Sequence, residues 1–237
     1  MTGNQARIAA PVLSRVLAIV GTQTDEVTVS PDGEDGWKLV ARSADMVAMV
    51  SVRIGTPALE TTIDEPFAIG VPKWIQALRG DGRAEIAVTG GVAEVEVDGM
   101  TTRLPLYPAT DAPREPKLTL TARACVPVSA IRRLVDVTDI RGPVGYSFTI
   151  DDGGLTVGSH DENGMGTGVH VPVDVCIPEG SAVSKYPWKH WAALVKALPR
   201  DAVLTLSMES DYPMRVAFDL EEGVSGWWMV APMIESE

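Results

Sequence analysis

Apolar residues recur along the chain at two spacings, which together outline one small unit used four times. Four segments carry apolar residues at helical spacing and begin at or just after a proline, which suits the first helical turn because its missing N–H needs no partner there. These predicted helices are residues 11–20, 72–79, 127–135 and 188–198. A strand-like run precedes each helix, and about three runs of alternating Val, Ile and Thr follow it.

Two similar heptapeptides indicate that the pattern is also duplicated at a larger scale. ARIAAPV (residues 6–12) and ARACVPV (122–128) carry similar or identical residues at five of their seven positions. We therefore expect two similar domains, residues 1–106 and 118–237, each containing two strand–helix–three-strand units. The helices are expected on one face of antiparallel sheets, which is an α+β architecture. Prolines in residues 107–117 suit an extended interdomain connecting loop.

The net charge of the chain argues against a nucleic-acid partner, but the placement of the charges argues for one. The chain has 32 acids against 20 Lys and Arg, a net charge of −12, and a uniformly acidic surface repels phosphate. This balance also fits a halophilic protein kept soluble in high salt. None of the four predicted helical segments contains Asp or Glu. Their cations are Arg15, Lys73, Arg79, Arg132, Arg133, Lys189 and Lys196.

Helical periodicity places these cations on one face of each helix. On the second helix Lys73, Gln76 and Arg79 share a stripe, with apolar residues on the opposite side. A single such stripe is usually an ordinary solvated face. Four equivalent helices packed on sheets would instead merge their stripes into one basic surface that suits DNA phosphates.

The sequence predicts no enzyme, metal site or cofactor. It has no Gly-rich phosphate loop and no recognisable nucleophile motif. Cys125 and Cys176 lie in apolar runs, and we interpret them as reduced thiols of a cytoplasmic protein. No export signal is recognised, and no run approaches the roughly 18 apolar residues of a membrane span.

Three stretches carry a resemblance to a known family. The ending GWWMVAPMIESE runs from a hydrophobic strand into Ala231, Pro232, a variable residue, Ile and acids. Residues 44–54, ADMVAMVSVRI, and the stretch YSFTIDDGGLTVGSHDENG resemble two further segments of the same family. In these features the chain resembles the sliding clamps of the proliferating cell nuclear antigen (PCNA) family, of archaeal or archaeal-virus type.

The resemblance implies a DNA clamp fold and the function of a DNA polymerase processivity factor. Three chains would close head to tail into a homotrimeric ring around double-stranded DNA, held without sequence preference and with the helices lining the hole. Arg7, Arg123 and Arg200 are added as neighbours of the DNA-facing helices, and Arg7 and Arg123 are the matched arginines of the two heptapeptides. Ring contacts are expected between residues 100–106 and 167–173, where Pro172 limits the ladder and predicts a weak ring.

The resemblance also implies a pocket beneath the connecting loop for short motifs of DNA polymerase, clamp loader, nuclease and ligase in DNA replication and repair. The matching positions are Met46, Met49, Leu106, Pro108, Tyr212, Pro213, Met229, Val230, Ala231 and Pro232. Two alternatives stay open. One is a clamp-like subunit that works only in a heterotrimer, and the other is an α+β enzyme on a duplicated scaffold.

Overall fold

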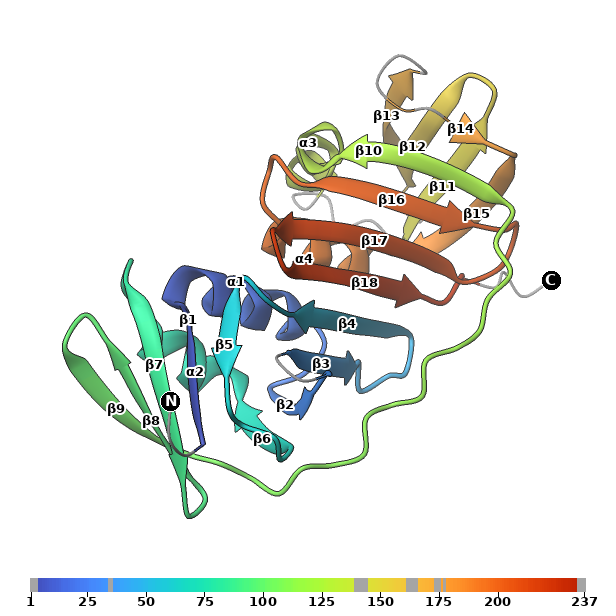
Figure 1. Cartoon of the computed structure of the whole chain (residues 1–237). Coiled ribbons are helices and arrows are strands. Elements are labelled where there is room, and N and C mark those ends of the chain that lie inside the picture. Colours follow the sequence, from blue (N-terminus) through green and yellow to red (C-terminus); the bar gives the residue numbers. More distant parts are fainter. Residues whose placement is uncertain are drawn as a thin grey trace. The chain divides into compact units, whose positions relative to one another are not determined.

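The structure is a computed structural model that describes residues 4–33, 36–138, 145–160, 166–172, 176 and 178–233 (Figure 1). The chain divides into two compact units. Unit 1 comprises Met1–Arg114 with Leu220–Gly226, and unit 2 comprises Glu115–Asp219 with Trp227–Glu237.

Unit 1 contains two helices and the first nine strands. The helices are α1 (Ala10–Val20) and α2 (Val71–Ala77). The strands are β1 (Gln5–Ala9), β2 (Glu26–Pro31), β3 (Trp37–Arg42), β4 (Ala48–Ile54), β5 (Leu59–Thr61), β6 (Phe67–Gly70), β7 (Arg83–Thr89), β8 (Val92–Val97) and β9 (Met100–Pro105).

Unit 2 repeats this order of elements. Its helices are α3 (Val128–Thr138) and α4 (Trp188–Ala197). Its strands are β10 (Ala122–Pro127), β11 (Gly145–Asp151), β12 (Gly154–His160), β13 (Gly166–Pro172), β14 (Pro178–Glu179), β15 (Ala182–Pro187), β16 (Val203–Met208), β17 (Met214–Glu221) and β18 (Val224–Val230). The tip of the β17–β18 hairpin, Leu220–Gly226, is grouped with unit 1.

The two units have the same strand topology. The order β5-β1-β7-β8-β9 in unit 1 recurs as β14-β10-β16-β17-β18 in unit 2, and β4-β3-β2-β6 recurs as β13-β12-β11-β15. The strand registers are antiparallel throughout the described pairs. The predicted α+β fold with a duplicated strand–helix–three-strand unit is therefore confirmed. The sequence pattern missed β5 and β14, because strands of two or three residues are too short to show alternation.

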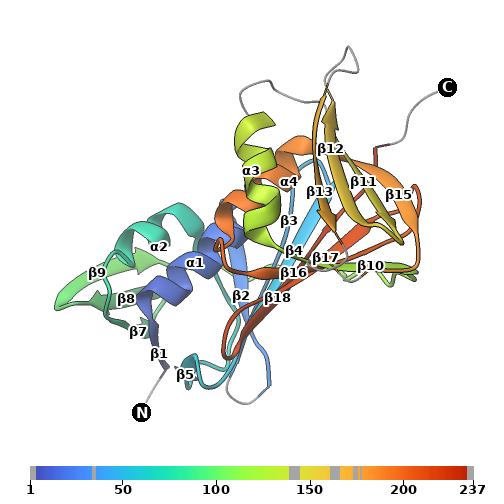
Figure 2. The ribbon, with the colours of Figure 1, turned by 90° about the horizontal axis from the view of Figure 1, so that it is seen from above.

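Within each unit the two helices lie side by side on one face of the sheets (Figure 2). In unit 1 the layer between helices and sheets includes Trp37, whose ring centroid lies 5.9 Å from that of Phe67. In unit 2, Trp191 lies 4.8 Å from Phe148 and 5.6 Å from Trp228 between ring centroids. These aromatic contacts hold the helices against the strands.

Helix α3 extends three residues beyond the predicted end at residue 135. The apolar spacing continues through Ile131, Leu134, Val135 and Thr138, all of which are buried. The Thr138 hydroxyl donates to the Leu134 carbonyl at 2.8 Å and lies 2.6 Å from the Tyr146 hydroxyl, so the last turn is satisfied. This extension brings Asp136 into α3, and the expectation of four acid-free helices is wrong for this helix.

The heptapeptide match is out of register with the duplicated fold by two residues. The first helical N–H of α1, from Ala10, donates to the Gly82 carbonyl, and that of α3, from Val128, donates to the Ala202 carbonyl. Ala10 therefore corresponds to Val128, whereas the heptapeptides align Ala10 with Val126. Since the same shift pairs Arg7 with Cys125, the interpretation of Arg7 and Arg123 as matched positions is wrong.

The connection between the units begins as a tethered strand. Tyr107 exchanges two backbone hydrogen bonds of 2.9 and 3.0 Å with Ala68 of β6. The Thr110 N–H donates to the Thr28 hydroxyl of β2 at 3.1 Å. Residues 108–121 form no helix or strand. The first residues after β9 thus run along the β6 and β2 edge of unit 1.

Candidate nucleic-acid interface

The cations of unit 1 lie largely on the solvent side of the helices. Lys73 and Gln76 of α2 are exposed, as is Arg79 just past its end, whereas Trp74 and Leu78 are buried against the sheet. The short helix therefore presents the polar stripe that its sequence predicts.

Arg15 of α1 is less free to act on a ligand. Its side chain is 40% exposed, and its Nη1 lies 3.7 Å from a carboxylate oxygen of Glu221. This contact is an exposed ion pair, of a kind that contributes at most about 1 kcal/mol to stability. Phosphate could therefore compete with Glu221 for this guanidinium.

Unit 2 carries four exposed cations on or beside its helices. Lys189 and Lys196 lie two turns apart on α4, opposite the buried Trp191, Leu194 and Val195. Arg133 of α3 and Arg200, in the loop before β16, are also exposed. The structure thus brings the predicted cations of α3 and α4 together on neighbouring helices, with Arg132 as the exception.

Arg132 does not extend into solvent as its neighbour does. Its Nη1 donates to the backbone carbonyls of Val195, Lys196 and Leu198 at 3.3, 3.2 and 3.3 Å. Its Nε is buried without a hydrogen-bond partner among the described residues. The guanidinium is therefore placed at the end of α4, a contact with residues more than sixty positions away that no local pattern could predict.

Asp136 is the functional feature that sequence reasoning missed on the helices. It is exposed on α3, three residues after Arg133. The signal was available, because the apolar spacing through Thr138 places the helix end after Asp136. Its carboxylate makes the α3 surface less positive than the two arginines alone suggest.

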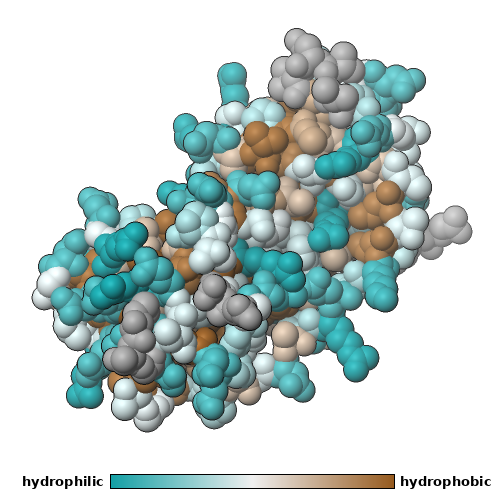
Figure 3. Space-filling model, viewed as in Figure 1, coloured by the Kyte–Doolittle hydropathy of each residue, from teal (hydrophilic) through white to brown (hydrophobic). Residues whose placement is uncertain are grey.

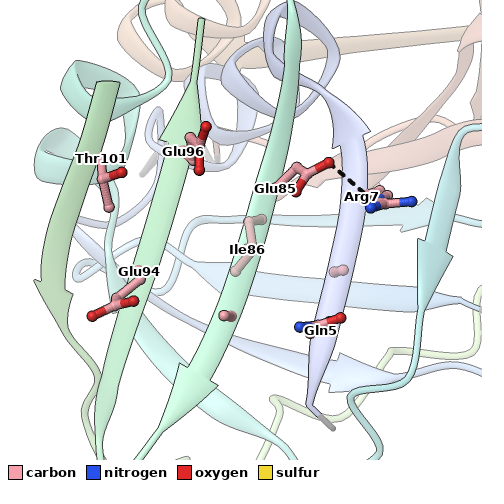
Figure 4. Close-up of a pocket in the computed structure, with 9 residues that line it drawn as sticks. Gln5, Arg7, Glu85, Ile86, Glu94, Glu96 and Thr101 are labelled. Atoms are coloured by element: carbon pink, nitrogen blue, oxygen red, sulfur yellow. Dashed lines mark ion pairs between the residues drawn. The ribbon is translucent and has the colours of Figure 1, made fainter. Parts of the chain in front are cut away.

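Arg7 lies on the sheet face opposite the helices (Figure 4). Ala6 and Ile8, its neighbours on β1, are buried, so strand alternation turns Arg7 outward. Its Nε lies 3.2 Å from a carboxylate oxygen of Glu85. Arg7 is thus neutralised on the outward face, and its assignment to a DNA-facing surface shared with the helices is corrected.

Arg123 has the same orientation in unit 2. It alternates with the buried Ala122 and Ala124, and it pairs in register with Ser207 on one side and Glu179 on the other. Arg123 therefore also lies on the outward face, and it too is removed from the helix-face set.

Acids gather on this outward face of unit 1. A hollow over β1, β7 and β8 is lined by Glu85, Glu94 and Glu96 together with Arg7 (Figure 4). Glu85 and Glu96 are direct cross-strand partners. Hydrophilic side chains cover this part of the surface (Figure 3). In unit 1 the outward sheet face and the helix face thus differ in the sign of their unpaired charge.

The residues expected to form the partner-motif pocket divide between the two units. In unit 1, Met46 is 70% exposed in the turn before β4, Pro108 is exposed and Leu106 is half-buried, but Met49 is buried in β4. This burial assigns Met49 to core packing.

The members in unit 2 divide in the same way. Tyr212 is exposed, whereas Pro213, Ala231 and Pro232 are half-buried. Met229 and Val230 are buried in β18. Trp227 lies 5.3 Å beneath the Arg215 guanidinium, and Trp228 is fully buried.

A buried tyrosine supports the loop that carries Tyr212. The Tyr186 hydroxyl donates to the Tyr212 carbonyl at 2.9 Å, and burial raises the pKa of Tyr186 to about 12. The neutral, donating form of this hydroxyl is therefore favoured. Cys125 and Cys176 are free thiols, and burial raises the pKa of Cys176.

The described residues contain no cluster of three or more His, Cys, Asp or Glu arranged to hold a metal ion. Among the same residues, no helix combines the length and apolar character needed to cross a membrane.

Sequence comparison finds full-length relatives, although no family model matches the chain. The chain is 25% identical over 243 residues to the DNA polymerase sliding clamp of Methanothrix thermoacetophila, covering 98% of this chain and 99% of that one. It is 24% identical to the DNA polymerase sliding clamp of Natronomonas pharaonis and 25% identical to that of Haloarcula marismortui, with the same coverage.

Structure comparison finds the same fold in solved clamps. A. fulgidus PCNA, bound to the C-terminal region of FEN-1, superposes with a TM-score of 0.89 at 20% identity, covering 99% of this chain and all of that one. PCNA from Thermococcus kodakaraensis gives a TM-score of 0.86 at 17% identity, over 97% of this chain and all of that one.

Proposed function

Because the chain belongs to the DNA polymerase sliding clamp family, we propose that it is a processivity factor that closes into a ring around double-stranded DNA and tethers a DNA polymerase to its template. Members of this family are not enzymes, and this chain would act by topology and by docking. Its place of work would be the cytoplasm, at the nucleoid of a prokaryotic or virus-infected cell.

One observation carries the proposal most directly. In unit 1 the exposed cations Lys73 and Arg79 lie on the helix side, whereas Glu85, Glu94 and Glu96 gather on the opposite sheet face. Such segregation lets an acidic protein offer phosphate an attractive surface despite its net charge. The proposed DNA-facing set is Arg15, Lys73, Arg79, Arg133, Lys189, Lys196 and Arg200.

These contacts would hold DNA without reading its sequence. Lysine and arginine contacts to phosphate carry no base information, and they weaken steeply as salt rises. A ring need not grip tightly, since encirclement keeps it on the duplex while weak contacts let it slide.

Two edge strands support closure of the ring. Strand β9 ends one sheet of unit 1, and β13 ends one sheet of unit 2. Pairing β9 of one chain with β13 of the next would close a head-to-tail homotrimer and cover both edges. Residues 1–106 and 118–237 would be the two domains, joined by the connecting loop 107–117.

A heterotrimer is the second candidate, because Pro172 ends β13 and shortens the ladder that a second copy can form. A solved relative from Sulfolobus tokodaii is a complex of PCNA2 and PCNA3, with a TM-score of 0.85 at 13% identity. Light scattering on the pure protein separates the two candidates. A homotrimer has three times 25.3 kDa, about 76 kDa, whereas a persistent monomer at all salt concentrations favours the heterotrimer.

We assign partner docking to the accessible members of the predicted pocket. Met46, Leu106 and Pro108 of unit 1 and Tyr212, Pro213, Ala231 and Pro232 of unit 2 would contact short motifs of polymerase, clamp loader, nuclease and ligase. Methionine suits such a surface because its flexible side chain repacks against different partners.

The decisive experiment changes charge on the two faces separately. Lys73→Glu combined with Lys189→Glu should abolish polymerase stimulation while leaving the oligomer intact by light scattering, because repulsion replaces two phosphate contacts.

Neutralised pairs provide the matched control. Lys73→Gln with Lys189→Gln should weaken stimulation, whereas Arg7→Gln with Arg123→Gln should leave it at the wild-type level because both arginines face outward. Equal loss in the two neutralised pairs, or unchanged stimulation in the reversed pair, would overturn the assignment of the helix face to DNA.

A further inference from the structure

Arg132 and Arg133 are adjacent on α3 but have opposite surroundings. Arg133 is exposed, whereas Arg132 is half-buried and has a buried Nε. The Nη1 of Arg132 reaches three backbone carbonyls at the end of α4, those of Val195, Lys196 and Leu198. The pair therefore offers one cation to solvent and one to the neighbouring helix.

The end of α4 needs such a donor. The last four carbonyls of a helix lack partners within the helix. After α4 the chain turns to extended backbone at Leu198 (φ −77°, ψ 148°), so no left-handed residue closes the helix. A guanidinium at this place supplies hydrogen-bond donors and a positive charge beside the negative end of the helix dipole.

The duplicated fold provides an internal comparison. Because Ala10 of α1 corresponds to Val128 of α3, Ser14 takes the place of Arg132 and Arg15 takes that of Arg133. The serine side chain is too short to span to a neighbouring helix as an arginine does. The exposed cation is thus kept in both units, while the clamping arginine belongs to unit 2 alone and is not a requirement of the fold.

We propose that Arg132 is a positioning residue that fixes the last turn of α4 on α3 and thereby places Lys196, rather than a ligand of DNA phosphate. The contact with α4 stands on the geometry alone, and its consequence for DNA rests on the proposed function.

Amide hydrogen exchange on the full chain tests the clamp without DNA. Arg132→Met keeps an aliphatic stem but removes the donors and the charge, and Arg133→Met is the matched change one position along. The amides of residues 196–198 should exchange about tenfold faster in Arg132→Met and at the wild-type rate in Arg133→Met. Wild-type exchange in Arg132→Met would overturn the proposal.

Duplex binding over a range of salt tests the role of Arg132 in placing Lys196. Arg133→Met should reduce the slope of log affinity against log salt by about 0.9, the value for one lost phosphate contact, whereas Arg132→Met should change it by less than half of that. Lys196→Met should cost less affinity in the Arg132→Met background than in the wild type, and Lys73→Met should cost the same in both. Additive losses at Lys196 and a full slope change in Arg132→Met would identify a phosphate ligand instead.

A second variant covers the case in which Arg132→Met does not fold. Arg132→Lys keeps the charge on a side chain without the guanidinium fork, so the clamp predicts exchange about threefold faster at residues 196–198. A phosphate ligand predicts wild-type exchange and a wild-type salt slope. Failure of every variant and of the wild type to bind duplex would refute the proposed function, and the exchange result would still decide the clamp.

Discussion

At the scale of single residues, Asp136 is the exposed acid beside the proposed phosphate contacts of α3. It lies three positions after Arg133, so the two side chains are neighbours on the helix surface. Asp136→Asn should raise duplex affinity about twofold to fivefold, because removing one exposed charge is worth a few tenths to 1 kcal/mol. Fluorescence anisotropy at low salt would measure this change.

The control for Asp136 is an acid on the other face. Glu96→Gln, in the outward hollow of unit 1, should leave duplex affinity unchanged. An equal gain from both substitutions would mean that only net charge matters, and no gain from Asp136→Asn would place α3 away from the DNA.

Tyr186 predicts a stability change at alkaline pH. Its pKa is raised from 10.0 to about 12, so its neutral form stabilises the folded state below pH 10, and that contribution is lost as pH rises toward 12. The loss amounts to about 2 to 3 kcal/mol. Urea unfolding from pH 8 to 12 should show a smaller decline in Tyr186→Phe than in the wild type.

Tyr107→Phe serves as the control for this titration, because Tyr107 is 37% exposed. Its stability should decline with pH as the wild type does. A wild-type decline in Tyr186→Phe would contradict the role given to the Tyr186 hydroxyl, which also holds the carbonyl of Tyr212.

At the scale of the elements, the helices and most strands were predictable from periodicity alone. The predicted helix of residues 188–198 and the observed α4 differ only at Leu198. The register between the two halves was not predictable from the heptapeptides. A shift of two residues keeps every strand side chain on its face, so hydrophobic alternation fits both registers equally. Only the hydrogen bonds from Ala10 and Val128 distinguish them.

The candidate site was predictable in part for a related reason. Helical spacing correctly placed Lys73 and Lys196 on exposed faces. It could not show that Arg132 bonds to carbonyls on another helix, because a sequence pattern gives a residue's own face and not its tertiary partners. Arg7 and Arg123 are strand residues, and their outward direction follows from the burial of Ala6, Ile8, Ala122 and Ala124.

Strand β13 predicts a way to strengthen the proposed ring. Pro172 lacks a backbone N–H at the end of this edge strand. Pro172→Thr should tighten self-association about fivefold, because one added backbone hydrogen bond contributes about 1 kcal/mol. Light scattering over a dilution series would measure the dissociation constant. Unchanged self-association would show that this end of β13 makes no ladder contact between chains.

At the scale of the whole molecule, salt acts on two interactions in opposite directions. Each chain carries a net charge of −12, so added salt screens the repulsion between chains and favours the oligomer. The same salt weakens the contacts between cations and phosphates. In a salty cell interior, encirclement would therefore contribute more to retention on DNA than binding would.

This balance predicts different retention on circular and linear DNA. Protein loaded onto a closed circle should survive a wash in molar salt, because no end exists from which a ring can slide. Cutting the circle once before the wash should release it, although the cut leaves nearly every phosphate contact available. Gel filtration of the washed complex would measure the retained fraction. Equal loss from circle and linear duplex would mean that the protein is held by charge alone, since a topological link depends on DNA ends and ionic contacts do not.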